Sequence, residues 1–324
     1  DGAQLGDLSI GGIGTVTGSA NFAAAANAAN VTGGGTKAAN ANAQVNTVDG
    51  LVSLSGDGSG GIDISSDAGI QGLASIDLAS AAQSTGATGA ETTATATSGN
   101  DTTTLTGAEL NSLTDIGGVG SITGQVSLSS TADAANVTGM AKGVGTLNTA
   151  EGLDLNAKLE VASDATVSGS AGISSSADAS TTAGDATAES LSTTITGADL
   201  SGGLVDIGGI GSIAGQANFG LSASSSNVSD TSTATADSAG ATGLIGKVVT
   251  DGDFGIDVAS DSGLSGMAIG SLTADASSTA GTTTAIAGQG DKAIGAQLPS
   301  LNVGGISNLT GAAQLDSSAT ASNV

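Results

Sequence analysis

Seven copies of a short glycine-centred motif constrain this chain more than any other feature of the sequence. Each copy runs from an apolar residue through a small or polar residue, a glycine and a variable residue to alanine or valine. Self-similarity at a regular period is the signature of repeat architectures, so the unit is a half-repeat of about 50 residues. The central glycines lie 45 to 54 residues apart, at Gly18, Gly72, Gly124, Gly169, Gly215, Gly266 and Gly311.

The half-repeats come in two alternating types. In every second copy the motif follows a Gly-Gly pair and then one off-parity apolar residue: Ile13, Val119, Ile210 or Ile306. A local bulge or a corner after the pair would explain that break in parity. The motif copies between these landmarks lack the pair, so two successive half-repeats form one full repeat.

Alternation inside the unit predicts β-strands. From Ile207 to Leu221 every second residue is apolar or glycine, which is the period of a strand with one face inward. A helix would need apolar residues at spacings of three and four. Many glycines share the inward parity, and glycine in a strand often marks a close backbone approach. We therefore expect opposing sheets to approach each other closely at the seven central glycines.

These patterns predict an elongated all-β repeat protein. The preferred architecture is a flattened β-solenoid of about 50-residue half-repeats, with two long strands in each and six or seven layers in all. A long-stranded antiparallel β-sandwich is the alternative. We expect one repetitive β domain over residues 1–324, with repeats at approximately 1–104, 105–195 and 196–293 and a partial repeat at 294–324.

Polar stretches separate the patterned strands at 90–106, 174–194 and 224–243. Their low hydrophobicity is compatible with flexible loops. However, threonine alternates with small residues at Thr93–Thr97 and Thr231–Thr235, and threonine favours strands. Ordered strand and flexible loop therefore remain the two interpretations of these stretches.

The composition suits a thin stack and offers little to catalysis. The chain has 54 Gly, three Phe and no Trp, Tyr, Cys or His, so large side chains, which supply most burial energy in an ordinary core, are scarce. Burial must then come from many small, close contacts. Without His, Cys or Arg, nothing obvious supplies the base of a nucleophile pair. We expect no enzyme activity and no cofactor.

The charge narrows the choice of partners. Thirty acidic residues against five basic ones give a formal charge of −25, which argues against nucleic acid and anionic lipid because both need a basic surface. No apolar run approaches the ~20 residues of a membrane helix, so no membrane insertion is expected. A signal peptide, had one existed, would already have been removed. Composition alone therefore favours an extracellular or cell-surface location.

Two acidic turns are the only candidate metal sites in the sequence. They partly resemble the glycine- and aspartate-rich calcium nonapeptide of β-roll proteins, and hard oxygen ligands on tight turns suit Ca²⁺. Solvated turns are the alternative, since the nonapeptide is not tandem here. The candidate ligands are Asp57, Asp63, Asp251, Asp253 and Asp257.

Asparagine recurs at one position of the repeat within glycosylation sequons. Asn30, Asn136 and Asn227 occupy equivalent places in three repeats and are candidate glycan carriers if the chain is secreted. A turn asparagine that simply recurs with the repeat is the alternative.

Both ends of the sequence carry the same repeat markers, which bears on assembly. Gly2-Ala-Gln-Leu5 recurs as Gly295-Ala-Gln-Leu298. A head-to-tail contact between such ends gives a filament where it does not close, and exposed β-edges would supply the hydrogen bonds. We therefore expect a homopolymer: the subunit of an extracellular filament, fibre or sheath. An adhesin or phage-fibre stalk and an ice-binding β-solenoid are the alternatives.

Overall fold

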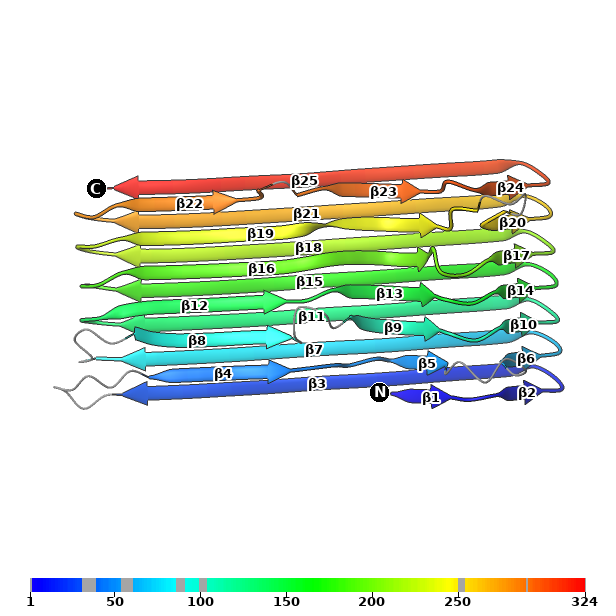
Figure 1. Ribbon diagram of the computed structural model, residues 1–324, viewed down its shortest axis with the longest axis horizontal. Coiled ribbons are helices and arrows are strands. Elements are labelled where there is room, and N and C mark those ends of the chain that lie inside the picture. Colours follow the sequence, from blue (N-terminus) through cyan, green and yellow to red (C-terminus); the bar gives the residue numbers. More distant parts are fainter. Residues whose placement is uncertain are drawn as a thin grey trace.

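The computed structural model describes residues 2–30, 39–53, 61–85, 91–98, 104–249, 254–289 and 291–323. Within these ranges the chain forms strands and turns and no helix. The strands belong to three sheets, and every strand pair recorded between them is parallel. Figure 1 shows the strands stacked in successive levels from the N-terminal to the C-terminal end.

The first sheet, here the long-strand sheet, contains seven strands of 17 residues each. Its outer strands are the first and the last in sequence. In chain order the strands are β3 (Gly14–Asn30), β7 (Ala68–Ser84), β11 (Gly120–Asn136), β15 (Ala165–Thr181), β18 (Gly211–Asn227), β21 (Ser262–Ser278) and β25 (Ser307–Asn323).

The second sheet, the short-strand sheet, has seven strands of three residues that each precede a long strand. They are β2 (Leu8–Ile10), β6 (Ile62–Ile64), β10 (Thr114–Ile116), β14 (Leu159–Val161), β17 (Val205–Ile207), β20 (Ile256–Val258) and β24 (Leu301–Val303).

The third sheet, the return sheet, carries the chain back from the end of one long strand to the next short strand. Its strands are β1 (Ala3–Leu5), β4 (Asn40–Val45), β5 (Leu51–Ser53), β8 (Glu91–Ser98), β9 (Leu105–Leu110), β12 (Met140–Leu147), β13 (Ala150–Leu155), β16 (Ala186–Leu200), β19 (Ser232–Gly246), β22 (Thr283–Ala287) and β23 (Ala293–Gln297).

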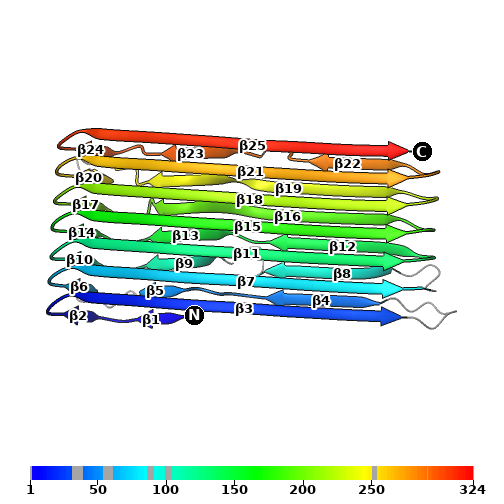
Figure 2. The same ribbon diagram turned by 180° about the vertical axis from the view of Figure 1, so that it is seen from behind.

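The chain therefore winds through return, short and long strands in a fixed order, and each winding adds one level to all three sheets (Figures 1 and 2). This order fits an all-β, solenoid-like fold. The antiparallel sandwich is wrong for this chain, because each strand pairs with its equivalent one winding later and both run in the same direction. The expectation of two long strands per half-repeat needs correction too: β16 and β19 are single return strands of 15 residues, whereas β4 and β5, like β12 and β13, are separate shorter strands.

The polar stretches that the sequence left open contain strands where they are described. Thr93–Thr97 lies in β8, and most of Thr231–Thr235 lies in β19. The small residues between these threonines face inward and are buried. The threonines themselves lie on the solvent-facing side of a half-buried strand.

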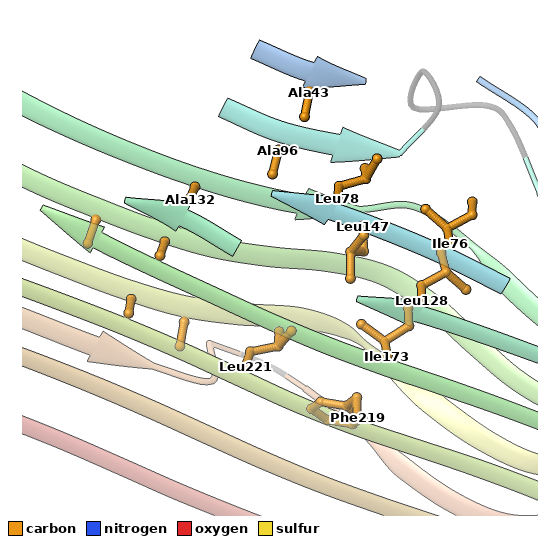
Figure 3. Packing of buried hydrophobic residues seen from close by; sticks show 14 of the residues in the cluster. Ala43, Ile76, Leu78, Ala96, Leu128, Ala132, Leu147, Ile173, Phe219 and Leu221 are labelled. Atoms are coloured by element: carbon orange, nitrogen blue, oxygen red, sulfur yellow. The ribbon is translucent and has the colours of Figure 1, made fainter. Parts of the chain in front are cut away.

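Two hydrophobic cores lie between the sheets. The near core sits where all three sheets meet, and 21 of its 25 buried members are Val, Leu or Ile. The far core lies between the long-strand and return sheets alone, and 24 of its 37 buried members are Ala. Figure 3 shows this far core, with Leu128, Ile173 and Phe219 towards one end and Ala96 and Ala132 towards the other.

A glycine seam separates the two cores. The seven central glycines of the motif pair in strict register along the long-strand sheet, from Gly18 beside Gly72 to Gly266 beside Gly311. A second row of glycines faces them from the return side: Gly50, Gly107, Gly152, Gly197, Gly243 and Gly295. Methyl groups built on either row overlap opposing backbone, except at Gly311. Only glycine lets the two backbones approach this closely.

The two types of half-repeat differ at the corner between short and long strands. In windings without the Gly-Gly pair, an aspartate fills the corner, and its carboxylate accepts a hydrogen bond from the next winding. Asp67 Oδ1 accepts from Val119 N (2.9 Å), and Asp164 Oδ1 accepts from Ile210 N (2.8 Å). The carboxylate occupies the space where a side chain on Gly118 or Gly209 would lie. The Gly-Gly pair therefore makes room for the aspartate of the preceding winding.

The off-parity apolar residues lie at this corner, where the expected break in parity occurs. Ile13, Val119, Ile210 and Ile306 are all exposed. Each stands between a short strand and the following long strand, outside both. The break is a corner between two sheets, since the recorded long-strand registers run without a bulge.

Candidate functional site

The candidate calcium ligands do not come together in the part of the chain that is described. Asp57, Asp251 and Asp253 lie outside the described residues. Asp63 lies in β6 and Asp257 in β20. They are the two ends of a row of acidic residues across the short-strand sheet, and the residues between them are Asp115, Glu160 and Asp206. Among the described residues no group of three or more acidic side chains is arranged to hold a metal ion.

One lysine, Lys158, lies beside this acidic row, just before β14. The Lys158 ammonium pairs with the Glu160 carboxylate and lies 3.9 Å from Asp206 Oδ2. Its hydrogen bond to Glu160 raises the lysine pKa. At the C-terminal end of the row, Asn302 donates its amide to Asp257 Oδ1 at 2.9 Å. The protein's own donors therefore already engage part of the row.

A second acidic cluster lies on the return sheet beside the glycine seam. Asp154 pairs in register with Glu109 on one side and Asp199 on the other. Glu151 lies three residues earlier on the same strand, β13, between Thr106 and Thr196. The sequence contained a signal for this cluster: Gly107-Ala-Glu-Leu110 and Gly197-Ala-Asp-Leu200 are further copies of the marker at Gly2–Leu5 and Gly295–Leu298, with an acid in place of Gln. Register was needed to place Asp154 between their acidic residues.

Burial and mutual repulsion make this cluster hard to ionise. Burial raises the pKa of Glu151 to about 7, and the charges of Asp154, Asp199 and Glu109 act in the same direction. Burial likewise raises the pKa of Asp154 to about 6, although the hydrogen bond from Asn156 lowers it. Carboxyls with raised pKa values exchange protons near neutral pH, which catalytic sites also exploit. Here the register neighbours of Glu151 are the hydroxyl residues Thr106 and Thr196, and those of Asp154 are other acids.

The candidate glycan carriers lie where the long strands end. Asn136 and Asn227 are both buried. The Asn136 amide donates to Met140 O (3.1 Å), and the Asn227 amide donates to Thr231 O (3.1 Å) and to Gly184 O. A glycan would have to be attached to these same amide nitrogens, so the contacts favour the recurrent turn asparagine. Asn30 ends the first long strand and is partly buried.

The equivalent position in the intervening windings carries Ser84, Thr181 and Ser278. The residue that follows it is a threonine, and in two of these windings its hydroxyl donates to the valine of the preceding one: Thr279 Oγ1 to Val228 O at 2.6 Å, and Thr182 Oγ1 to Val137 O. A shallow groove of about 530 Å³ runs along the C-terminal ends of the long strands. Its lining combines Asn, Ser, Thr and Gln side chains with the exposed Val137 and Val228, and it includes no ionisable side chain.

The outward threonines of the return sheet form rows that charged residues interrupt. The row through Thr95 continues to Val144, Glu189 and Thr235. Glu189 forms an ion pair with Lys142 of the neighbouring row at 3.4 Å. A flat array of uncharged hydroxyls, which ice binding would need, is therefore broken at the middle of this face.

Inward positions that are buried within the stack are exposed on its last long strand. Leu264 of β21 is 1% exposed, whereas its register partner on β25, Leu309, is 55% exposed. Among the described strands, β25 is flanked by β21 on one side only, and β3 by β7 on one side only. The long-strand sheet therefore presents two complementary backbone edges.

No helix in the described ranges is long and apolar enough to cross a membrane. Comparison with known proteins finds no family model, no curated protein and no solved structure that matches this chain. Its function has to be argued from the geometry described above.

Proposed function

We propose that this chain is a flattened β-solenoid of about 50-residue half-repeats that serves as the structural subunit of an extracellular filament, fibre or sheath. Copies add head to tail, the β25 end of one against the β3 end of the next. The chain is a homopolymer former with no catalytic role. Its acidic surface keeps the unassembled subunit soluble.

The observation that carries this proposal is the pair of open, equivalent edges on one parallel sheet. β3 and β25 run in the same direction and carry the same glycine register through all intervening strands. Unpaired strand edges are templates for pairing with another chain. A heterologous contact of this kind repeats without closing when successive subunits are related by translation.

The glycine seam gives a test that spares the fold of the subunit. A side chain on Gly266 would overlap the Gly295 carbonyl of the following winding, but the nearest atom to a methyl group on Gly311 lies 3.6 Å away. Gly311→Val should therefore fold normally yet leave no room for the backbone of a further winding. Ala312→Val, at the next and outward-facing position of β25, is the matched control.

Negative-stain microscopy and sedimentation velocity over a range of protein concentrations measure the outcome. We expect filaments from the unmodified chain and from Ala312→Val, and particles of subunit size from Gly311→Val. A chain that stays monomeric at high concentration would overturn the proposal. Filaments of Gly311→Val would show that assembly uses another surface.

A further inference from the structure

One face of the last described winding is uncovered, whereas a return strand covers the equivalent face of each preceding winding. Here the far part of the return sheet means the strands that pack on the far core: β4, β8, β12, the first halves of β16 and β19, and β22. Each of these segments lies between two consecutive long strands, as β19 lies between β18 and β21 (Figures 1 and 2). β22 lies between β21 and β25, and no described strand lies on its other side.

The uncovered surface repeats residues that are buried elsewhere. Ala274 and Ala276 of β21 are 0% and 2% exposed beneath the return sheet. Their register partners on β25, Ala319 and Ala321, are exposed. This side of β25 keeps one polar contact to the return sheet, because Ser317 Oγ donates to Ala287 O of β22 at 2.7 Å. The far half of β25 is thus a floor for one more return segment.

Register shows which side chains such a segment needs. Two inward positions recur through the far part of the return sheet. The first is occupied by Ala41, Ala94, Gly143, Ala188, Ala234 and Ala285, and the second by Ala43, Ala96, Gly145, Ser190, Ala236 and Ala287. Only Ala, Gly and Ser appear at either position. The space is narrowest at Gly143, where even a methyl group would overlap the Asp178 carbonyl.

We propose that the face formed by the free edge of β22 and the far half of β25 binds an extended peptide segment. The segment runs parallel to β22 and carries Ala, Gly or Ser at alternate, inward positions. Main-chain hydrogen bonds to the β22 edge supply affinity, and the shallow space over Ala319 and Ala321 supplies selectivity, as in other cases of β-strand addition. The outward positions of the segment are unrestricted.

This inference does not depend on filament formation. A subunit that never polymerises would still bind such a strand, and a subunit that polymerises through another surface could leave this face open. It also differs from general edge stickiness, because it specifies which alternate side chains must be small.

A labelled peptide with the sequence of residues 91–98 of this chain probes the face. Its inward residues would be Thr92, Ala94, Ala96 and Ser98, as in β8. Fluorescence anisotropy with the unmodified protein, at concentrations where sedimentation shows single subunits, should give saturable binding. Hydrogen exchange should then show added protection in β22 and β25 and unchanged protection in β8.

Two matched peptides separate the inward from the outward face. A peptide with both alanines changed to leucine (Ala94→Leu and Ala96→Leu) should bind at least tenfold more weakly. A peptide with Thr93→Leu and Thr95→Leu has similar added hydrophobicity on the other face and should bind within about threefold of the original. On the protein, Ala319→Glu should weaken binding at least tenfold, and Thr320→Glu, at an outward-facing position, should not.

The proposal would be overturned by either of two results. One is absence of peptide binding to the single subunit. The other is binding that is equally strong for both leucine peptides, or that protects a strand other than β22 and β25, since either would mean nonspecific adhesion to an edge.

Discussion

The near core and the far core belong to the same windings yet are built from different side chains. The near core is filled by Val, Leu and Ile from three sheets, whereas alanine dominates the far core between two sheets. Three converging sheets leave a wide space that needs large residues, and two sheets facing each other leave a thin one. A chain poor in aromatic residues can stabilise both because close packing over many small contacts adds up.

The difference shows that the two cores of one winding require side chains of different size. In the near core the expected damage comes from making side chains smaller, and in the far core from making them larger. The glycine seam between them, apart from Gly311 at its end, has no room for an added methyl group. Substitutions at matched positions can therefore test the comparison directly.

The largest effect is expected at the seam. Gly215→Val places a side chain against the Gly243 carbonyl, so the two sheets must separate locally and uncover parts of both cores. We expect a loss of more than about 5 kcal/mol in the free energy of unfolding, beyond the usual range for single substitutions. Urea denaturation followed by circular dichroism measures it. Gly220→Ala, on the same strand with open space around it, is the control and should change stability by less than about 1 kcal/mol. Equal stability of the two variants would contradict the seam.

The next effect belongs to the near core. Ile213 is fully buried there, and Ile213→Ala should cost about 2–5 kcal/mol because a cavity forms between three sheets that cannot all collapse. The same denaturation experiment measures the change. Ile210→Ala, at the exposed corner of the same winding, should cost less than about 0.5 kcal/mol.

The far core should be destabilised by the opposite change, a larger side chain. Ala223 is buried between the long-strand and return sheets, and Ala223→Leu should cost about 1–3 kcal/mol through overpacking. The control is Ser222→Leu, at the neighbouring outward position, which adds a similar volume in solvent. If Ala223→Leu stabilises the protein, the far core has unfilled space and the proposed contrast fails.

The smallest effect depends on pH and arises at the outer side of the seam, next to Gly152. Burial raises the pKa of Glu151 from 4.5 to about 7, so the folded chain holds this proton more tightly than the unfolded chain. The ionised carboxyl therefore destabilises the fold, and stability should be lost as pH rises from about 4.5 to about 7 and be regained on acidification. We expect Glu151→Gln to raise stability at pH 8 by roughly 1–2 kcal/mol, after allowance for solvent screening, and to change it little at pH 4.

Unfolding curves at both pH values measure this difference. Glu91→Gln, on an exposed position of β8, is the control and should not alter the pH dependence. A Glu151→Gln variant that loses stability equally at both pH values would point to a packing role in place of a charge effect.

Much of the fold could be read from particular residues. Alternation from Ile207 to Leu221 predicted a strand with one inward face, and the structure confirms it from Gly211 onward as β18, whereas Ile207 ends β17 across a corner. The threonine alternation at Thr93–Thr97 likewise indicated the strand that β8 forms. The candidate sites were less accessible. Asp63 and Asp257 looked like parts of separate turns, and their place in one row of the short-strand sheet depends on pairing between windings. The same is true of Asp154 between Glu109 and Asp199.

The sequence by itself determined the long strands, their inward faces and the spacing of the central glycines, because these follow from periods within a single segment. Only the tertiary structure decided that the strands pair in parallel, that a third short sheet closes the near core, and that an aspartate of one winding takes the space that the next winding's glycines leave open. Those features depend on contacts between residues about 50 positions apart, and alternation along one strand carries no information about which strand lies beside it.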